Sequence, residues 1–352
     1  MSLPLTKSPD SLCILRLSAV GDISHTLPVV RNLQHTWPRT RLTWIIGKSE
    51  HQLVYDIPDI EFIIFDKKAG WRAYRDVRRQ LRGRHFDALL HMQMSLRASM
   101  LSLLVHSPIK LGFDRQRAKD LQWLFCNHKI AYRPTQHVID SFFGFSEALG
   151  IEQKHLQWDI PVPAEARNII QEQLPAETPY LVISPCSSMA YRNWDALRYA
   201  EVASYASERY GLAIVLSGGP SVIEHEFGRI ISEHCRCPVI NLIGKTSLKQ
   251  LLALLQDAKL VIAPDAGPAH LANAMGTPVI GLYATTNPDR ARPYNSPQLV
   301  VNRYPEAVHC KYGKPVAALP WGIRVRDAGT MSRITVADVT SMLDKFMQQK
   351  AV

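Results

Sequence analysis

The feature that most constrains the fold of this chain is an alternation of short apolar runs with amphipathic segments, which continues from end to end. The apolar runs predict buried strands, and the segments between them have the spacing of helices. This order is typical of parallel sheets covered by helices, the α/β class. In the first half the expected strands are Leu12–Leu17, Leu42–Ile46, Glu61–Phe65, Asp87–His91 and Lys110–Phe113.

The alternation is interrupted between Ile160 and Tyr180, where prolines leave room for only a short helix around Ala166–Gln173. Proline at this density favours a linker between domains. Because 352 residues exceed one ordinary core, we expect an N-terminal domain at 1–165 and a C-terminal domain at 175–335. The strands expected in the second domain are Tyr180–Ser184, Ala213–Ser217, Val239–Leu242, Leu260–Ala263 and Val279–Leu282.

The second half also predicts helices, and the chain past Pro305 is expected to be irregular until the last of them. That last helix lies in segment 335–352, and we expect it to pack back toward the N-terminal domain. The expected helices are Trp194–Arg209, Val222–His234, Ser247–Gln256, Pro268–Met275 and Thr335–Gln349.

Composition narrows the class of protein. Hydrophobic residues make up 46% and charged residues 20%, the balance of a globular protein, which excludes a disordered chain. No apolar run approaches the length needed to span a bilayer, and no signal-peptide pattern opens the sequence. We therefore expect a cytoplasmic protein or one on the cytoplasmic membrane face. The net charge of +10 favours an anionic partner: nucleic acid, phospholipid headgroups or a phosphorylated substrate.

The first segment with candidate chemistry is 16–28, RLSAVGDISHTLP, directly after a predicted strand. Gly21 permits a tight turn, and Asp22 is expected just before a helix. A carboxylate in this position can act as a general base toward a hydroxyl, or it can simply cap the helix. Gly21 has no glycine partners, which disfavours a Rossmann-type dinucleotide site.

The second segment is 261–270, VIAPDAGPAH, in which a strand runs into Asp265 and a helix then carries His270 in its first turn. Gly267 lets the backbone approach a ligand, and free N–H groups at a helix start can hold a diphosphate. Each residue alone could be structural, as a helix cap or a buried histidine. The combination D-x-G-P-x-H after a strand is much more specific.

Two further loops follow strands of the second series. The loop 184–194, SPCSSMAYRNW, offers hydroxyls at Ser187 and Ser188 and the guanidinium of Arg192, which suits phosphate oxygens. The turn 217–220, SGGP, could approach a nucleotide, with Glu224 close behind it. Taken alone, each of these two segments is more typical of an ordinary loop.

Together the four segments resemble glycosyltransferase family 9, the lipopolysaccharide heptosyltransferases of Gram-negative bacteria, from Leu12 to the last helix. The resemblance implies the GT-B fold, two Rossmann-like domains with parallel sheets facing a central cleft. It implies inverting transfer of heptose from ADP-heptose to Kdo of the inner core, without a cofactor or metal site. The chain is most similar to members that add the first heptose to Kdo-lipid A; addition of the second heptose stays open.

By resemblance, Asp22 is the base that activates the acceptor hydroxyl. Ala266 departs from the family, which often has threonine there, and Glu226 is an alternative to Glu224 as the acidic residue after the glycine turn. The implied donor-binding residues are Ser187, Ser188, Arg192, Gly218, Glu224, Thr246, Asp265, Ala266, Gly267 and His270.

The acceptor side is expected to be basic, because Kdo-lipid A carries carboxylates and phosphates. The candidate residues could equally form a solvated face. The stretch 67–84, in which Trp71 and Tyr74 interrupt many cations, could rest against headgroups of the inner membrane or be an ordinary exposed helix. The acceptor candidates are Arg97, Arg115, Arg117, Lys119 and His137.

Two other functions remain open from the sequence. One is a sugar-nucleotide epimerase of similar two-domain build, which needs no acceptor. The other is a noncatalytic protein that binds nucleotides or nucleic acid, suggested by the charge alone. No RRM, KH or helix-turn-helix signature is present, so we expect no nucleic-acid partner.

Overall fold

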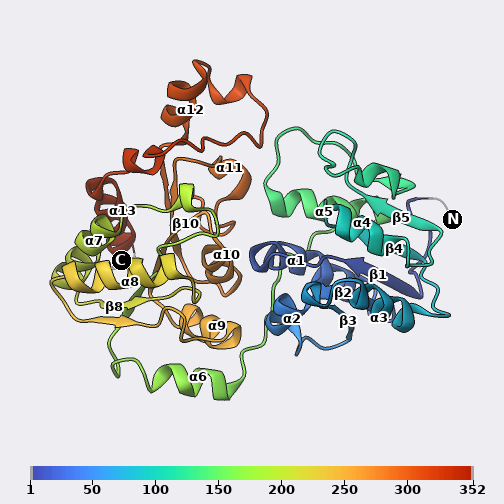
Figure 1. Cartoon of the computed structure of the whole chain (residues 1–352), viewed down its shortest axis with the longest axis horizontal. Helices are drawn as coiled ribbons and strands as arrows, with labels where there is room; N and C mark the ends of the chain where they lie inside the picture. The colour runs from blue at the N-terminus through green and yellow to red at the C-terminus, as the bar shows by residue number, and fades with distance from the viewer. Residues whose placement is uncertain (1–2, 350–352) are drawn as a thin grey trace. The chain divides into compact units, whose positions relative to one another are not determined.

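The computed structural model describes residues 3–349, and the chain divides into two compact units between Pro161 and Val162. Each unit contains one six-stranded sheet covered by helices (Figure 1). All strand pairs within both sheets are parallel, as the alternating sequence predicts. The expected α/β class is therefore confirmed.

The sheet of the N-terminal unit has the strand order β3-β2-β1-β4-β5-β6. Its central strands are buried throughout, as expected where helices cover both faces of a parallel sheet. The strands are β1 (Ser11–Leu15), β2 (Arg41–Gly47), β3 (Ile60–Phe65), β4 (Ala88–His91), β5 (Ile109–Gly112) and β6 (His128–Lys129).

The helices of this unit form two packed groups. Ala73, Val77 and Leu81 of α3 share one apolar cluster with Ala98 and Leu101 of α4 and with the strands beneath them. Helices α1 and α5 pack against each other. The helices are α1 (Val20–Thr36), α2 (Lys48–Val54), α3 (Trp71–Leu81), α4 (Leu96–Ser102) and α5 (Val138–Leu149).

Helix α1 continues through Pro28, although proline removes one helical hydrogen bond. The carbonyl left without its usual partner belongs to Ser24, four residues earlier. The indole of Trp158 donates a hydrogen bond to this carbonyl at 2.8 Å, and the bond is buried. A side chain from the end of the unit thus compensates for the proline and keeps the first turns of α1 in place.

The sheet of the C-terminal unit has the order β12-β11-β10-β7-β8-β9. Its strands are β7 (Tyr180–Ile183), β8 (Ala213–Leu216), β9 (Val239–Asn241), β10 (Leu260–Pro264), β11 (Val279–Tyr283) and β12 (Val300–Asn302). Its helices are α6 (Ala164–Gln171), α7 (Ala196–Tyr210), α8 (Val222–His234), α9 (Leu248–Gln256), α10 (Gly267–Ala274), α11 (Pro288–Ala291), α12 (Tyr304–Tyr312) and α13 (Val336–Gln349).

Three expectations for the second half need correction. The irregular segment begins only after Tyr312, because Pro305 lies in the first turn of helix α12, where its missing N–H costs nothing. The proline-rich stretch is more than a linker: α6 packs on α9, and its Arg167 pairs with Asp257 at 2.7 Å. Helix α13, which we expected to pack back toward the N-terminal domain, packs on α7 (Figure 1) and buries Val339 and Leu343 in the core of the C-terminal unit.

In each sheet the strand order reverses at the first strand of the unit, because the strands that follow it in the sequence are added on both of its sides. In the N-terminal unit β1 lies between β2 and β4, and in the C-terminal unit β7 lies between β8 and β10. Ligands of open α/β sheets bind outside the carboxyl ends of the strands at such a switch point. Segments after β1 and β4, and after β7 and β10, are therefore the places to look for sites. Among the described residues, no helix has the length and apolar character needed to cross a membrane.

Candidate active site

Asp22 lies at the switch point of the N-terminal sheet and is held by a buried arginine. The Arg16 guanidinium forms an ion pair with the Asp22 carboxylate and donates a hydrogen bond to the Met92 carbonyl at 2.6 Å. Arg16 extends from the end of β1, and Met92 follows β4, so this side chain spans the two strands. The Asp22 side chain remains 42% exposed and therefore accessible to a substrate.

The helical position of Asp22 differs from the expectation. Helix α1 begins at Val20, so Asp22 lies in its first turn, neither before the helix nor at the N-cap, which is Ala19. The carboxylate accepts a hydrogen bond from the Ala19 N–H at 3.3 Å. A carboxylate in the first turn also interacts favourably with the positive end of the helix dipole. Asp22 thus stabilises the helix start, and its exposure leaves a chemical role open.

One histidine borders this carboxylate, and a second packs against the first. Nδ1 of His25 lies 4.0 Å from the Asp22 carboxylate, one helical turn further along α1. The ring of His137, the N-cap of α5, packs edge-on to His25 with centroids 6.4 Å apart. His137 was expected on the acceptor side, whereas Arg16 and His25 were missed as candidates. The spacing of three residues between Asp22 and His25 could have indicated that both lie on one helix face.

The expected acceptor cations have different environments. Arg97 and Lys119 are exposed, and the Arg115 guanidinium lies over the ring of Trp123 at 4.7 Å. Arg117 instead pairs with Asp114 and donates hydrogen bonds to Gln136, Ser141 and Ala131. Because its guanidinium is engaged in this way, Arg117 holds the loop 114–136 against α5. Arg97, Arg115 and Lys119 are more accessible to an anion.

In the C-terminal unit, Asp265, Arg192 and His270 form one cluster. Nη1 of Arg192 lies 3.2 Å from Oδ2 of Asp265, and Nε2 of His270 lies 3.4 Å from Oδ1. Arg192 belongs to the short 3-10 helix η3 (Ala190–Arg192) after β7, and Asp265 follows β10. The cluster therefore lies at the switch point of the second sheet.

The charge of Asp265 is stabilised by this cluster. Burial alone would raise the pKa of the carboxyl, but the hydrogen bond from His270 and the charge of Arg192 lower the pKa to about 2. Asp265 is therefore ionised at neutral pH and fixes the side chains of both partners. Both carboxylate oxygens are engaged, so Asp265 acts through Arg192 and His270.

The start of α10 provides backbone donors beside the cluster. Its N-cap is Ala266, which makes no side-chain capping hydrogen bond, and the helix then begins at Gly267 and Pro268. First-turn N–H groups without a capping side chain, together with the helix dipole, form an anion-binding arrangement. A threonine at position 266 would offer a hydroxyl here. Alanine leaves these donors to a ligand.

The remaining donor candidates lie in neighbouring loops. Ser187 is half-buried and accepts a hydrogen bond from the Met189 N–H at 3.3 Å, while Ser188 is exposed. Both follow β7, the same strand that leads to Arg192. Thr246 lies one residue before the N-cap of α9, which is Ser247.

The structure distinguishes the two glutamates near the glycine turn. Glu224 folds back and accepts a hydrogen bond from the Gly219 N–H at 2.7 Å. A Cβ on Gly218 would lie 3.1 Å from the same carboxylate, so the turn and the glutamate fit closely together. Glu226 instead pairs with Arg229 at 2.8 Å on the exposed side of α8. Glu224 is thus the acidic residue associated with the turn.

Two residues beside Arg192, namely Tyr191 and Arg326, were not predicted from the sequence. The guanidinium groups of Arg192 and Arg326 lie 5.7 Å and 5.8 Å from the centre of the Tyr191 ring. Arg326 comes from the irregular segment after α12. Its proximity depends on tertiary packing, because η3 contacts the 3-10 helix η5 (Thr330–Arg333), and no local pattern in the sequence predicts it.

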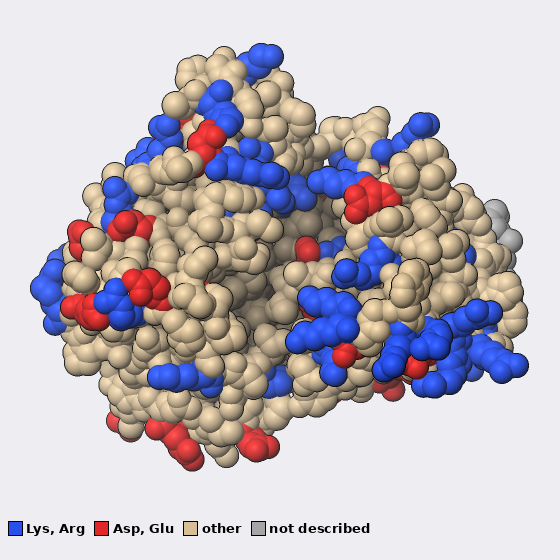
Figure 2. Space-filling model, in the orientation of Figure 1, with Lys and Arg blue, Asp and Glu red and all other residues tan. Residues whose placement is uncertain are grey.

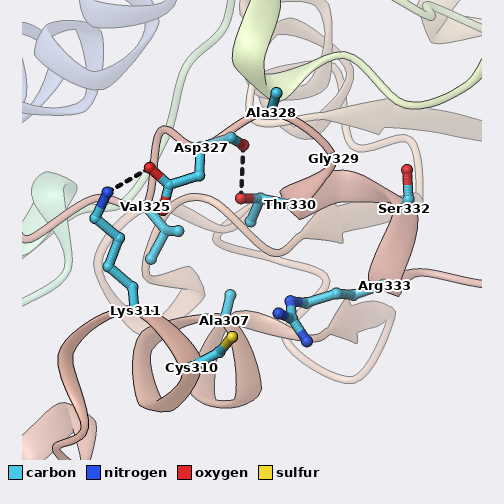
Figure 3. Close-up of a pocket in the computed structure, with 10 residues that line it drawn as sticks. All are labelled: Ala307, Cys310, Lys311, Val325, Asp327, Ala328, Gly329, Thr330, Ser332 and Arg333. Carbon is cyan, nitrogen blue, oxygen red and sulfur yellow. Dashed lines mark hydrogen bonds and ion pairs between the residues drawn. The ribbon is translucent and has the colours of Figure 1, made fainter.

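A pocket of about 460 Å³ lies between α12 and the segment that ends with η5 (Figure 3). Lys311 of α12 pairs there with Asp327, and the Arg333 side chain extends along the pocket toward Cys310. None of the donor candidates lines this pocket. Its lining residues are Ala307, Cys310, Lys311, Val325, Asp327, Ala328, Gly329, Thr330, Ser332 and Arg333.

The chain has two α/β units. The first carries an exposed carboxylate at its switch point, and the second carries an arginine beside an uncapped helix start. This combination is typical of a nucleotide-sugar glycosyltransferase. Comparisons with known proteins give the family. The family model "Glycosyltransferase family 9 (heptosyltransferase)" matches residues 74–317. The chain belongs to glycosyltransferase family 9 and is an enzyme, a heptosyltransferase.

Relatives and solved structures agree with this assignment. The chain is 41% identical to the lipopolysaccharide core heptosyltransferase OpsX of Haemophilus influenzae, over 97% of this chain and 98% of that protein. A family 9 glycosyltransferase from Veillonella parvula has the same fold, with a TM-score of 0.80, 23% identity and 97% of each chain covered. The E. coli heptosyltransferase WaaC, solved with ADP, gives 0.71 with 21% identity, over 96% of this chain and 99% of that chain. The expected GT-B fold is confirmed.

Proposed function

We propose that this enzyme transfers heptose from ADP-heptose to Kdo of the lipopolysaccharide inner core, with inversion at the anomeric carbon. The observation that carries the donor part is the Arg192–Asp265–His270 cluster beside the uncapped start of α10. A fixed guanidinium and converging N–H groups are suited to a diphosphate. The 41% identity to a lipopolysaccharide core heptosyltransferase supports the acceptor class.

In the proposed reaction the Asp22 carboxylate accepts the proton of the acceptor hydroxyl. The hydroxyl oxygen forms a bond to the anomeric carbon on the side opposite the diphosphate. The bond between that carbon and the diphosphate oxygen breaks, and ADP leaves with the electron pair. The N-terminal unit thus supplies the base, and the C-terminal unit supplies the groups that stabilise the leaving ADP.

The negative charge that develops on ADP is offset by groups of this chain alone, without a cofactor or metal. Arg192 provides a positive charge whose position is fixed by Asp265. The hydroxyls of Ser187 and Ser188 and the N–H groups at Gly267 provide neutral donors. Such preorganised donors stabilise a transition state because they need no rearrangement when the charge appears.

An acceptor attached to lipid A requires the enzyme to act at a membrane surface. We therefore include peripheral contact with the cytoplasmic face of the inner membrane in the proposal. The exposed cations Arg97, Arg115 and Lys119 are available for the carboxylates and phosphates of such an acceptor.

The test is incubation of the purified protein with ADP-heptose, with and without Kdo-lipid A, followed by mass spectrometry of both substrates. The proposal expects heptosylated lipid only when both are present. Conversion of ADP-heptose without acceptor would indicate an epimerase, and no turnover would indicate a binding protein. Transfer to heptosyl-Kdo-lipid A but not to Kdo-lipid A would instead assign addition of the second heptose.

A further inference from the structure

Helix α3 carries a row of arginines that no part of the donor or acceptor machinery uses. These side chains are exposed, and Figure 2 shows Lys and Arg gathered over the region of α3. Lys67 and Lys68, in the turn before the helix, extend the same basic surface. The arginines are Arg72, Arg75, Arg78, Arg79 and Arg82.

Most of this charge is not neutralised within the chain. Arg79 pairs with Asp76 at 3.1 Å. Over residues 3–349, none of the other four arginines forms an ion pair with a carboxylate. A row of unpaired cations on one exposed helix face is costly in self-repulsion and attracts an extended anionic surface.

Apolar side chains are exposed beside the arginines. Trp71, the first residue of α3, is 76% exposed and lies 5.4 Å from the ring of Tyr74. On α4, Leu96, Met100 and Leu103 are 56%, 39% and 58% exposed. Their spacing of four and three residues places them in one stripe along the helix. A stripe of exposed large apolar residues is typical of an interaction surface.

The basic row and the apolar stripe belong to one surface of the N-terminal unit. Helices α3 and α4 cover the same apolar cluster, with Val77 and Leu101 both packed into it. Tyr74, beyond α3's buried face, also packs against this cluster, as does Leu104, which follows α4. We call Lys67–Arg82 together with the exposed stripe of α4 the α3–α4 surface.

We propose that the α3–α4 surface docks this enzyme on an anionic phospholipid bilayer. The arginines contact headgroups, Trp71 lies at the interface, and the α4 stripe enters the outer edge of the acyl region. An apolar stripe distinguishes a bilayer from nucleic acid, which would use the cations and aromatic rings but not Leu96 or Leu103. The inference deepens the membrane contact within the proposed function and rests on it only for the biological source of the lipid.

The electrostatic part is tested with the full chain and vesicles of phosphatidylethanolamine containing about one third phosphatidylglycerol. Each arginine near such a surface contributes about fivefold to the partition coefficient. Arg75→Gln with Arg78→Gln should therefore weaken binding about 25-fold. The matched control is Arg209→Gln with Arg236→Gln, which removes the same charge from exposed positions of the C-terminal unit and should leave binding unchanged.

The apolar part needs its own variant. Leu96→Ser with Leu103→Ser should lower the binding that remains at 0.5 M NaCl at least tenfold, because salt screens the arginines but not the stripe. Brominated lipid should quench part of the tryptophan fluorescence in the wild type. This part should be absent in Trp71→Phe, which keeps most of the binding.

Any of four results would overturn the inference. The first three are equal vesicle binding by the arginine variant and its control, no loss in the leucine variant at high salt, and unchanged quenching in Trp71→Phe. The fourth is tighter binding to RNA than to anionic vesicles. Melting temperatures of all variants are compared with the wild type, so that loss of folding is recognised. Transfer to detergent-dispersed Kdo-lipid A tests the proposed function separately from vesicle binding.

Discussion

Arg192 contacts Asp265 at two points, because Nη1 lies 3.0 Å from the backbone carbonyl and 3.2 Å from the carboxylate. The two residues come from loops after β7 and β10, 73 residues apart in the sequence. The double contact fixes the guanidinium next to the start of α10. A cation fixed in this way loses little conformational freedom when it binds a phosphate.

Arg192→Ala should weaken ADP binding by about tenfold to 150-fold, because a hydrogen bond to a charged group contributes about 1.5–3 kcal/mol. Calorimetric titration with ADP measures this directly. Arg192→Lys is the matched control: it keeps the charge, and it should recover most of the affinity. If the alanine variant binds ADP like the wild type, Arg192 lies outside the nucleotide site.

Asp22→Asn should reduce transfer by about 10²–10⁴-fold, because an amide cannot accept the proton of the acceptor hydroxyl. Asparagine can still accept the hydrogen bond from the Ala19 N–H, so the helix start is preserved. The measurement is the steady-state rate with saturating ADP-heptose and Kdo-lipid A.

The control for Asp22→Asn separates catalysis from folding. The buried guanidinium of Arg16 loses its ionic partner in this variant, and some loss of melting temperature is therefore expected. ADP affinity should stay unchanged, because the nucleotide candidates all lie in the C-terminal unit. Turnover close to that of the wild type would leave Asp22 with a structural role alone.

The strands were predictable where they are long and apolar. All ten expected strands are present, with ends shifted by at most two residues. Two edge strands had no such signal: β6 is only His128–Lys129, and β12 is three residues long. Helix α12 was missed because Pro305 was interpreted as a breaker, although proline is favoured in the first turn of a helix.

The candidate site was predictable where its residues are close in the sequence. Asp265 and His270 are five residues apart. Because Asp265 directly precedes the N-cap of α10 and His270 lies in the first turn of this helix, their side chains come within 3.4 Å of each other. Arg16 was missed because its role depends on the Met92 carbonyl, 76 residues away and just after another strand. The packing of α13 was likewise a tertiary property: its apolar stripe predicts burial but not the surface on which it is buried.

Leu343→Ala in α13 should lower the free energy of unfolding by about 2–5 kcal/mol, the range for removal of a fully buried leucine side chain. Chemical denaturation monitors this change. Gln348→Ala, at an exposed position of the same helix, is the control and should change stability by less than about 0.5 kcal/mol. Equal stability of the two variants would contradict the packing of α13 in the C-terminal core.

Protonation of His91 makes the free energy of unfolding depend on pH, and the surroundings of the side chain determine the sign of this dependence. The imidazole is fully buried at the end of β4, with Nε2 3.2 Å from the hydroxyl of Ser99. Burial, together with the charges of Lys110 and Arg16, lowers the pKa of His91 to about 3, against an ordinary value of 6.5. Between these two pH values the unfolded chain binds a proton at this histidine and the folded chain does not.

The contribution of His91 to stability is therefore complete above pH 6.5 and falls on acidification, by about 1.4 kcal/mol per pH unit down to pH 3. His91→Gln keeps a hydrogen-bonding group near Ser99 but does not titrate, so it should remove this slope. Urea denaturation at pH 7, 6, 5 and 4 measures the difference in the free energy of unfolding between wild type and variant. The contributions of other titrating groups cancel in this difference. The exposed His234→Gln is the control substitution. Parallel curves for wild type and His91→Gln would show that folding does not lower the pKa of His91.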